Sequence, residues 1–430
     1  MEVVLRIVIV LLAAQLVFVL WNVRQLPPFR SLGVRSSYRA GEKGKAAERG
    51  DRQCKHQLSR GTLGSAALSN APMSNAALCS TTPNHAASST ADEPPFLSVL
   101  IPARDEEANI GECLRSIMNS MPSSGGIEII VLDDGSSDRT AAIVLQLAAN
   151  DPRVRLNTGR EKPEGWMGKA YACHQLAQAA RGQWLLYMDA DARMSSDAII
   201  HLEAAAMEQR QGLITGFPYQ VTGSWLERLV VPMMGFTIAC HLPIHLVRHS
   251  DDARFVAAHG AWIAVARHTY EAAGGHQANR ADLVDDMALA RAVKKAGHPV
   301  ILADVKDQVS MRMYRNAREV WNGYKKNMYA GVGRSLPLLA AVLILYSLLY
   351  LLPAIGLLLS LWMPDLLIPS IAGYGLGVFI KLVSDRSQGQ PAWLALLIPL
   401  SIAAITAIGI ASWLGAVNGK GYVWKGRVYG

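Results

Sequence analysis

The stretch Trp184–Met194, WLLYMDADARM, runs an apolar, strand-like segment directly into two carboxylates, Asp189 and Asp191, with one small residue between them. A loop at the end of a strand would explain this pattern, because Asp is a common loop residue. A divalent-cation site would also explain it, because carboxylates at i and i+2 can turn toward one hard cation. The surrounding sequence decides between the two.

Short apolar or β-branched runs alternate with helix-like segments from Phe96 onward. The strand-like runs are FLSVLIPA, IEIIVLDD, RVRLN, QWLLYMDAD and GLITGFP, and the segments between them include EEANIGECLRSIMNSM and SDRTAAIVLQLAAN. This alternation predicts an α/β fold with a mostly parallel sheet and helices on both faces. In such folds ligands bind beyond the carboxyl ends of the strands.

Acidic side chains follow three of the predicted strands. They are Asp105, Glu106 and Glu107, then Asp133 and Asp134, and then Asp189 and Asp191. Parallel strands bring these carboxylates to one edge, where their repulsion is costly without a cation or hydrogen-bond donors. This arrangement favours the cation-site interpretation.

Four apolar segments lie at the two ends of the chain, at 3–21, 336–363, 366–383 and 392–417, and they account for much of the 51% hydrophobic content. The first lacks a small-residue cleavage site, which predicts a retained anchor. The segments 336–363 and 392–417 are predicted spans, and the weaker segment 366–383 lies between them. The sequence therefore predicts a multi-pass protein of the cell membrane.

The net charge of +8 could indicate nucleic acid binding, but the Lys and Arg residues are scattered along the chain and are abundant beside the apolar segments. The basic flanks consist of Arg24, Arg30, Arg35 and Arg39, and of Arg312, Arg315, Arg318, Lys325 and Lys326. Because these flanks lie on the same side of two spans, they predict that the region between them is cytoplasmic, and they make nucleic acid binding the weaker explanation. The five cysteines are widely spaced and form no CxxC pair, as expected in a reducing compartment without a zinc site or disulfide framework.

The chain is expected to have five parts. A transmembrane anchor at 1–22 precedes a flexible linker at 23–95, which is rich in Ala, Ser, Gly, Asn and Thr. The catalytic domain is expected at 96–335, a transmembrane region at 336–416, and a basic tail containing WKGRVY at 417–430.

Four ordered motifs resemble those of family 2 glycosyltransferases, the nucleotide-sugar enzymes with the GT-A fold. The motifs are SVLIPARDEEANI, IIVLDDGSSDRT, GWMGKAYACHQLAQAARGQWLLYMDADA and DLVDDMALARAVKKAG. Two further stretches, MYRNAREVWNGYKKN at 313–327 and WKGRVY at 424–429, resemble the carotenoid glycosyltransferases that act on diaponeurosporenoate. This membrane-anchored subset also includes hopanoid lipid glycosyltransferases.

The resemblance implies a divalent cation, Mg²⁺ or Mn²⁺, held by Asp191, with Asp189 at the metal or the nucleotide. The charge that develops on a departing diphosphate would be neutralised there. Lys169 in GWMGK, at the opening of a helix, is expected to meet phosphate, although a solvated helix lysine is the alternative. The resemblance also implies contacts between the uracil or ribose and Ala103, Glu106, Asp133 and Asp134.

DLVDDMALA resembles the family's ED motif, with Asp285 at the Glu position and Asp286 at the Asp position. Asp286 is therefore expected to be the general base that deprotonates the acceptor. The replacement of Glu by Asp at position 285 departs from the family pattern and leaves the supporting role of that residue open.

The expected reaction is an inverting, metal-dependent transfer of one sugar, from a UDP-hexose, to a lipid or isoprenoid acceptor at the cytoplasmic membrane face. A processive polysaccharide synthase is the first alternative, but the QxxRW motif of that class is absent from the sequence. A nucleotidyltransferase would carry a glycine-rich basic loop where ARDEE stands. The third alternative is a non-catalytic nucleotide-binding membrane scaffold.

Three features remain open at the level of sequence. The apolar stretch 224–247 fits either core or an interfacial helix that receives a lipid. The histidines between 241 and 276 are expected to be packing or surface residues, with His259 and Gly260 candidates for the cleft. Three C-terminal spans would place the basic tail outside, against the positive-inside tendency, so the segment 366–383 is expected to be re-entrant or interfacial.

Overall fold

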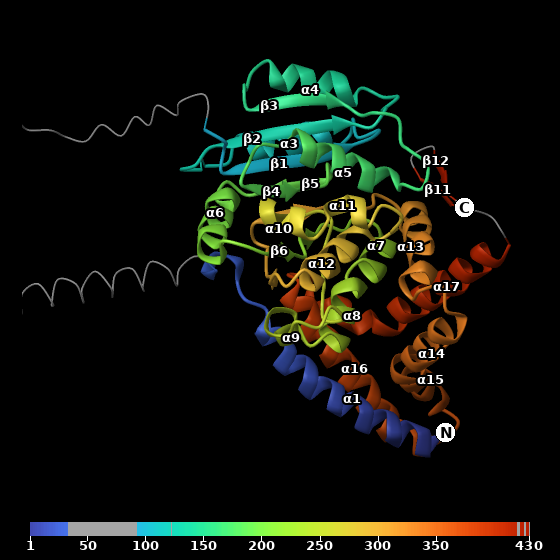
Figure 1. Ribbon diagram of the computed structural model, residues 1–430. Helices are drawn as coiled ribbons and strands as arrows, with labels where there is room; N and C mark the ends of the chain where they lie inside the picture. The colour runs from blue at the N-terminus through green and yellow to red at the C-terminus, as the bar shows by residue number, and fades with distance from the viewer. Residues whose placement is uncertain (33–92, 122, 419–421, 425–426, 430) are drawn as a thin grey trace, which may run out of the picture.

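The computed structural model describes residues 1–32, 93–121, 123–418, 422–424 and 427–429. Most of the stretch predicted as a flexible linker, 33–92, therefore lies outside the described residues. The catalytic domain lies at the top of Figure 1, and the apolar helices of the two chain ends lie below it.

The catalytic domain is built on a seven-stranded sheet with the order β3-β2-β1-β4-β8-β6-β9. Its strands are β1 (Leu97–Ala103), β2 (Ile127–Asp133), β3 (Val154–Thr158), β4 (Trp184–Tyr187), β6 (Leu213–Gly216), β8 (Ile263–Ala266) and β9 (Val300–Ala303). The strands β3, β2, β1 and β4 are parallel to their neighbours, β8 is antiparallel to β4 and β6, and β9 is parallel to β6. This mostly parallel sheet confirms the predicted fold class.

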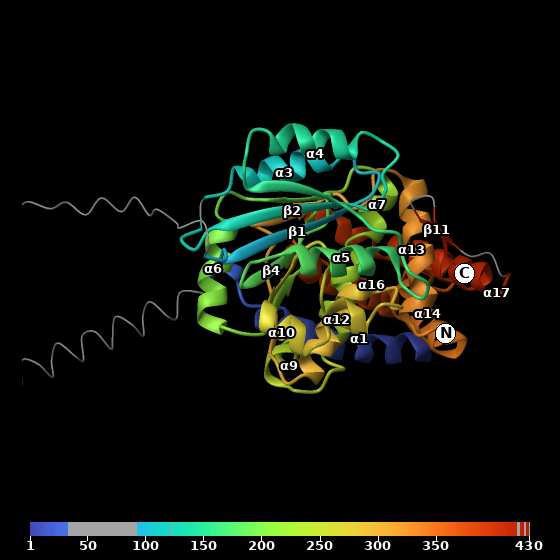
Figure 2. The ribbon, with the colours of Figure 1, turned by 45° about the horizontal axis from the view of Figure 1, so that its top comes forward.

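Helices cover both faces of the sheet. Alternate residues of a strand point to opposite sides, so neighbouring residues of β1 belong to different cores. Val99 of β1 belongs to the core shared with α3 (Ile110–Met118), α4 (Thr140–Ala148) and α6 (Ala198–Gln209). Its neighbour Leu100 belongs to the core shared with α5 (Gly168–Ala179), α9 (Ile244–His249) and α12 (Asp285–Lys295). Figure 2 shows α3 and α4 on one side of β1 and β2, with α5 on the other.

A second, three-stranded sheet has the order β5-β10-β7. Its strands are β5 (Ala192–Met194), β10 (Val309–Met311) and β7 (Tyr219–Gln220). Because β5 begins directly after Asp191 and pairs with β10, it brings the segment after β10 to the two carboxylates of the opening stretch. That segment leads into α13 (Ala317–Gly331).

The N-terminal helix α1 (Glu2–Asn22) ends against the catalytic domain, and the next ten residues continue along it. Pro28 bridges to Asp304 beside β9, and Phe29 is buried edge-on against Trp262, with their ring centroids 6.0 Å apart. The linker predicted to begin at residue 23 is thus wrong for 23–32. Phe29 secures this segment by its burial against Trp262.

The stretch 224–247 forms three short helices rather than one interfacial helix. They are α7 (Trp225–Val230), α8 (Met233–His241) and α9, and Pro232 and Pro243 separate them, since proline cannot continue a helix. Phe236 of α8 packs with residues of α1 and of the C-terminal helices. These short helices connect the catalytic domain to the apolar region. The remaining small helices, α10 (Arg267–Ala272) and α11 (Gly275–Ala278), follow β8.

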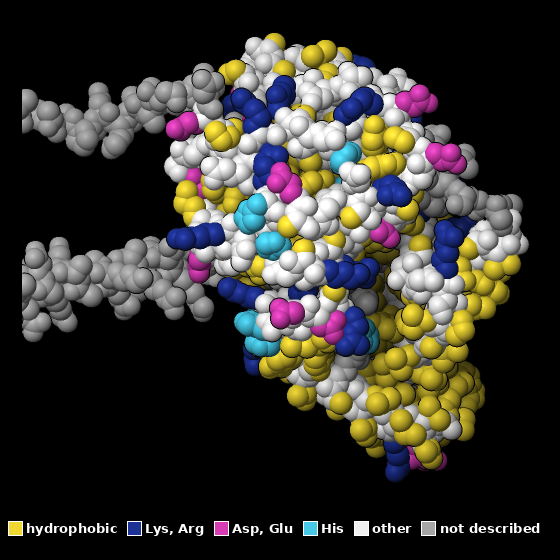
Figure 3. Space-filling model, viewed as in Figure 1, with side chains coloured by type: hydrophobic (Ala, Val, Ile, Leu, Met, Phe, Trp, Pro, Cys, Tyr) yellow, Lys and Arg dark blue, Asp and Glu magenta, His cyan; other side chains and the backbone are white. Residues whose placement is uncertain are grey.

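Among the described residues, four helical segments are long and apolar enough to cross a membrane. They are α1, α14 (Leu336–Tyr346) continuing through a π-helical segment (Ser347–Leu351) into α15 (Leu352–Leu359), α16 (Leu367–Ser387) and α17 (Ile398–Val417). The 21 residues of α16 form one unbroken helix, about 31 Å long at 1.5 Å per residue. The segment 366–383, expected to be re-entrant or interfacial, therefore contains no break in its helix. Figure 3 shows hydrophobic side chains over the part of the surface formed by α14 and α15.

The four segments differ in how their ends meet the catalytic domain. α1 and α16 run side by side, each with one end at the domain and the other away from it. Both ends of the α17 segment, in contrast, contact the domain. Just before it, the Gln390 amide donates to the Gln220 carbonyl at 2.9 Å, and near its end the Ser412 hydroxyl donates to the Lys325 carbonyl of α13 at 2.5 Å. The tail contains two short antiparallel strands, β11 (Tyr422–Trp424) and β12 (Arg427–Tyr429).

Candidate active site

Two neighbouring parallel strands place the predicted nucleotide-contacting residues at one edge. Ala103 of β1 stands opposite Asp133 of β2, and the Asp134 amide donates to the Ala103 carbonyl at 2.8 Å. One Asp133 carboxylate oxygen accepts the Ser136 amide at 3.0 Å, an Asx-type turn that opens the loop before α4. The structure thus brings Ala103, Asp133 and Asp134 together.

The ARDEE loop folds over this strand edge. Arg104 donates to the Asp134 carbonyl at 2.5 Å, and the Glu106 carboxylate accepts the Asn109 side-chain amide at 2.8 Å. The Glu106 amide donates to the Thr140 hydroxyl at 2.8 Å, which ties the loop to the start of α4. Glu106 therefore lies beside the strand edge, as the sequence predicted, with its backbone and side chain both held by neighbours.

The DAD turn follows β4 and is tight. The Ala192 amide donates to the Asp189 carbonyl at 3.0 Å, and Ala190 between the carboxylates is 2% exposed, so only a small residue fits there. Below the turn, the Cys113 thiol lies 3.8 Å from the Asp189 carbonyl oxygen, and burial raises the pKa of this thiol to about 12. Cys113 is therefore a neutral packing residue.

The donor set of this turn fits a divalent cation. Asp189 and Asp191 both leave the carboxyl end of β4 and are both half-buried. They supply hard carboxylate oxygens, which are the ligands that Mg²⁺ and Mn²⁺ prefer.

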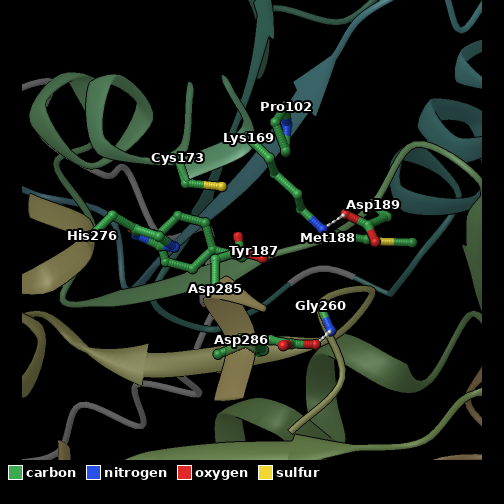
Figure 4. Close-up of a pocket in the computed structure, with 11 residues that line it drawn as sticks. Pro102, Lys169, Cys173, Tyr187, Met188, Asp189, Gly260, His276, Asp285 and Asp286 are labelled. Carbon is green, nitrogen blue, oxygen red and sulfur yellow. Dashed lines mark hydrogen bonds and ion pairs between the residues drawn. The ribbon is translucent and has the colours of Figure 1, made fainter. Parts of the chain in front are cut away.

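Lys169 lies in the first turn of α5 and reaches the DAD turn. Its ammonium nitrogen is 2.6 Å from one carboxylate oxygen of Asp189 (Figure 4). Burial alone would lower the pKa of Lys169, but Asp189 and Asp285 raise it well above its usual value, so the side chain is charged. The alternative of a solvated helix lysine does not describe this position.

Asp286 lies in the first turn of α12, across the site from Lys169 and Asp189. One of its carboxylate oxygens accepts the Gly260 amide at 2.9 Å, and the other accepts the Met287 amide at 2.7 Å. Burial and the neighbouring charge of Asp285 raise the pKa of Asp286 from 3.8 to about 6. A carboxylate with a pKa in this range is ionised at neutral pH and basic enough to accept a proton, as a general base requires.

Gly260 lies close to Lys169 and Asp189 and also to Asp286. A β-carbon at this position would lie 2.8 Å from the Lys169 ammonium, 3.6 Å from an Asp286 oxygen and 3.7 Å from an Asp189 oxygen. The absence of a side chain at position 260 therefore leaves room for Lys169. The expectation that Gly260 lines the cleft agrees with this geometry. His259 beside it is buried, with its pKa lowered by burial to about 4.

These residues enclose one small cavity of about 10 Å³, roughly the space for one water molecule. The predicted site residues Lys169, Asp189, Asp285 and Asp286 all line it, and Figure 4 shows them converging from different elements. Asp191 and the group at the ends of β1 and β2 do not line it. The predicted site therefore has two parts. The strand-edge part contains Ala103, Glu106, Asp133, Asp134 and Asp191, and the closed part contains the residues that line the cavity.

Three residues of the closed part were not predicted. Cys173, His276 and Tyr187 line the cavity, and the potential ligand atoms of Cys173, His276 and Asp285 lie within 4.8 Å of one another. Burial raises the pKa of Cys173 well above its usual value and lowers that of His276 to about 4, so both are neutral at pH 7. Cys173 lies one helical turn after Lys169, a spacing that could have signalled it, whereas nothing in the spacing of the histidines distinguishes His276.

The segment after β10 lies beside the predicted site, although the sequence indicated only a basic flank and a family resemblance there. Arg315 donates to the Asn109 side-chain oxygen at 2.6 Å, which joins this segment to the ARDEE loop. Burial and the nearby Asp191 raise the pKa of Tyr314 to about 12. On α13, burial and the charge of Lys169 lower the pKa of Lys326 to about 8. MYRNAREVWNGYKKN is thus joined to the ARDEE loop without lining the cavity.

Comparison with known proteins agrees with this arrangement. Residues 98–256 match the family described as glycosyl transferase family 2. The 4,4'-diaponeurosporenoate glycosyltransferase of Staphylococcus aureus strain USA300 is 26% identical over 339 residues, which cover 77% of this chain and 88% of that protein. The same enzyme of strain MRSA252 is 26% identical over 343 residues. Together with the sheet, the family match confirms the expected GT-A fold class.

Two solved structures are similar over most of the chain. The mannosyltransferase PcManGT from Pyrobaculum calidifontis, in complex with GDP-Man and Mn²⁺, is 19% identical with a TM-score of 0.47, covering 76% of this chain and 89% of that one. TarS 1–349 of S. aureus, in complex with UDP-GlcNAc, is 14% identical with a TM-score of 0.37, covering 77% of this chain and 95% of that one.

Proposed function

From the premise that this chain carries a family 2 glycosyltransferase domain over residues 98–256, we propose that it transfers one sugar from a nucleotide sugar to a lipid acceptor. The observation that carries the proposal is the convergence of a charged lysine, the first DAD carboxylate, Asp189, and a basic aspartate on one cavity, in a domain attached to apolar helices. The proposed donor is a UDP-hexose, whose nucleoside lies against the strand edge formed by Ala103, Glu106, Asp133 and Asp134.

The reaction is a single inverting displacement. The acceptor oxygen attacks the anomeric carbon while the bond from that carbon to the diphosphate oxygen breaks. Asp286 takes the proton from an acceptor hydroxyl, and the nucleoside diphosphate leaves with the bonding electron pair. The Gly260 amide holds the Asp286 carboxylate in place, and Asp285 keeps its pKa near neutral.

Negative charge grows on the leaving diphosphate, and Lys169 is the cationic side chain placed to stabilise it. Its present partner is Asp189, so phosphate and Asp189 share the ammonium when the donor binds. A divalent cation held by Asp191 and Asp189 would supply further stabilisation of the same charge. Because Ala190 is buried between the two carboxylates, the turn itself fixes their spacing.

The proposed acceptor is a hydrocarbon chain that ends in a hydroxyl or carboxyl group. The apolar helices support a membrane acceptor, and the similar S. aureus enzyme is named for a carotenoid acid. The absence of a QxxRW motif from the sequence favours one sugar per acceptor over a growing polymer. A non-catalytic scaffold would not require a raised pKa at Asp286, whereas a general base does.

The proposed topology has three spans. α1, the α14–α15 helix and α16 cross the membrane, and α17 lies in the interface on the catalytic side, because both ends of its segment contact the catalytic domain. This arrangement places the tail, with Lys420, Lys425 and Arg427, on the cytoplasmic side with the catalytic domain, as the positive-inside tendency requires. The sequence had indicated the segment 366–383 as the one that does not cross, whereas we propose that α17 is the one that does not cross.

Topology is tested with epitopes at the two chain ends in sealed vesicles of both orientations. We expect the C-terminal epitope to be accessible on the side of the catalytic domain and the N-terminal epitope on the opposite side. Four spans would instead expose both termini on the side opposite the catalytic domain.

The activity is tested with purified, detergent-solubilised protein, a panel of UDP and GDP sugars, Mg²⁺ or Mn²⁺, and a lipid extract. We expect metal-dependent transfer that Asp191→Ala abolishes for every acceptor. Asp286→Asn should abolish transfer to lipid alcohols while it retains donor binding. The matched control Asp282→Asn removes an exposed carboxylate near α12 and leaves transfer unchanged. Donor binding with no transfer to any lipid would support the scaffold alternative.

A further inference from the structure

A large apolar groove lies between the α14–α15 helix and α17, away from the catalytic cavity. Its volume is about 620 Å³, within the range of small-molecule sites. Representative lining residues are Leu339, Leu343, Leu348 and Ile355 on one side and Ile410 and Trp413 on the other. Among the described residues that line it none is charged, and the hydroxyls are those of Ser347 and Thr406.

The groove is joined to the catalytic domain through α13. A β-carbon on Gly409 of α17 would lie 3.0 Å from Leu343 of α14 and 3.2 Å from Met328 of α13, so the three helices meet there. On α13 itself, the Lys325 carbonyl accepts the Ser412 hydroxyl of α17 at 2.5 Å. The segment that leads into α13 reaches the predicted site, because Arg315 donates to Asn109 beside the ARDEE loop at 2.6 Å. The α13 segment therefore connects the groove to the predicted site.

We propose that this groove binds the hydrocarbon chain of the acceptor and so determines which lipids are glycosylated. The inference rests on the proposed transfer to a lipid. It goes further because it assigns the hydrocarbon chain of the acceptor to this groove. The proposed occupant is a single acyl or isoprenoid chain that lies between a spanning helix and an interfacial one. In this proposal the polar end of the acceptor lies toward α13, the helix that connects the groove to the predicted site.

Three features favour a hydrocarbon occupant over another protein or a second copy of this chain. The groove adjoins helices that are apolar enough to lie in lipid, so it is continuous with the membrane surface of the protein. It is lined almost wholly by aliphatic side chains, whose contact with a hydrocarbon removes apolar surface from water. It is also a groove of limited volume rather than a broad flat face, which suits one flexible chain.

Occupancy is tested by photo-crosslinking with a diazirine-bearing palmitate in phosphatidylcholine vesicles, followed by peptide mass spectrometry. We expect crosslinks concentrated in 336–355 and 406–413, and reduced several-fold by an excess of a long-chain isoprenoid acid but not by additional phosphatidylcholine. Crosslinks spread evenly over α1 and α16, or lost equally with phosphatidylcholine, would mean that bulk lipid alone fills the groove and would overturn the proposal.

Function is tested by filling the groove with Ala340→Trp, because Ala340 lines it. The matched control is Ala372→Trp on α16, an exposed position outside the groove. We expect Ala340→Trp to raise the KM for lipid acceptors at least tenfold with unchanged donor affinity, and the control to change neither. Unchanged KM in a folded Ala340→Trp protein would overturn the groove assignment.

The assignment of the groove and the proposed transfer to lipid can fail separately. If wild-type protein transfers sugar to lipid and Ala340→Trp behaves like the control, the groove inference fails and the proposed function stands. If wild-type protein binds the donor and transfers to no lipid, the proposed function fails, while crosslinking still reports whether the groove holds a hydrocarbon chain.

Discussion

The sharpest prediction concerns the pH dependence of transfer and the role of Asp285. Asp286 acts as a base only when ionised, and its pKa is raised to about 6, so transfer to an alcohol falls as the pH drops through about 6. At pH 5 about a tenth of the enzyme retains an ionised Asp286, because each pH unit below the pKa changes the ratio about tenfold. At pH 8 the rate lies on its plateau.

Asp285→Asn tests the cause of that shift. Burial of Asp286 remains in the variant, but the like charge that raises its pKa is gone. We expect the acidic limb to move down by about one pH unit, which corresponds to about 1.4 kcal/mol. Activity at pH 5 then rises from about a tenth to about half of the variant's own plateau.

The assay is a profile of kcat/KM from pH 4.5 to 8 with a lipid alcohol, each enzyme normalised to its own maximum. Asp282→Asn, which removes an exposed carboxylate nearby, is the control and should keep the wild-type limb. An identical limb in wild type and Asp285→Asn, or a wild-type limb near the ordinary aspartate pKa, would refute the assignment of Asp286 as the base under the influence of Asp285.

Three other perturbations have defined outcomes. Gly260→Ala puts a β-carbon 2.8 Å from the Lys169 ammonium, so we expect a displaced lysine, an activity loss of about 10- to 100-fold and an unchanged Tm, measured by transfer assay and thermal melting. Asp286→Asn should abolish transfer to a lipid alcohol but spare transfer to a lipid carboxylate, which is already ionised at pH 7, as a paired-acceptor assay would show. Phe29→Ala should destabilise the domain by about 3 to 5 kcal/mol, because Phe29 is 1% exposed, and a smaller loss in denaturant unfolding would contradict its role as an attachment point.

Much of the fold could be predicted from the sequence because its signals are local. Short apolar and β-branched runs marked the strands, and each predicted acidic cluster does follow a strand. The attachment of residues 23–32 was missed because it depends on Phe29, whose pocket is built from distant segments. The proposed return of α17 has no signal in the sequence for a related reason. Its apolar composition suits a span, and the proposal is supported by contacts with Gln220 and Lys325.

The candidate site was predictable in part. Lys169, Asp189, Asp285 and Asp286 were named from motifs, and the fold places them around one cavity. Long-range geometry supplied the rest, because His276 reaches the cavity from the short helix α11, and no spacing in the sequence indicates that approach.

The most direct test of the central claim is analysis of the product. Purified protein is incubated with a UDP-α-hexose and membrane lipid, and the lipid fraction is examined by mass spectrometry and NMR. We predict a lipid that carries one hexose in the β configuration, formed by wild type and not by Asp191→Ala. A polymer, a retained α linkage, or sugar that never enters the lipid fraction would contradict the account.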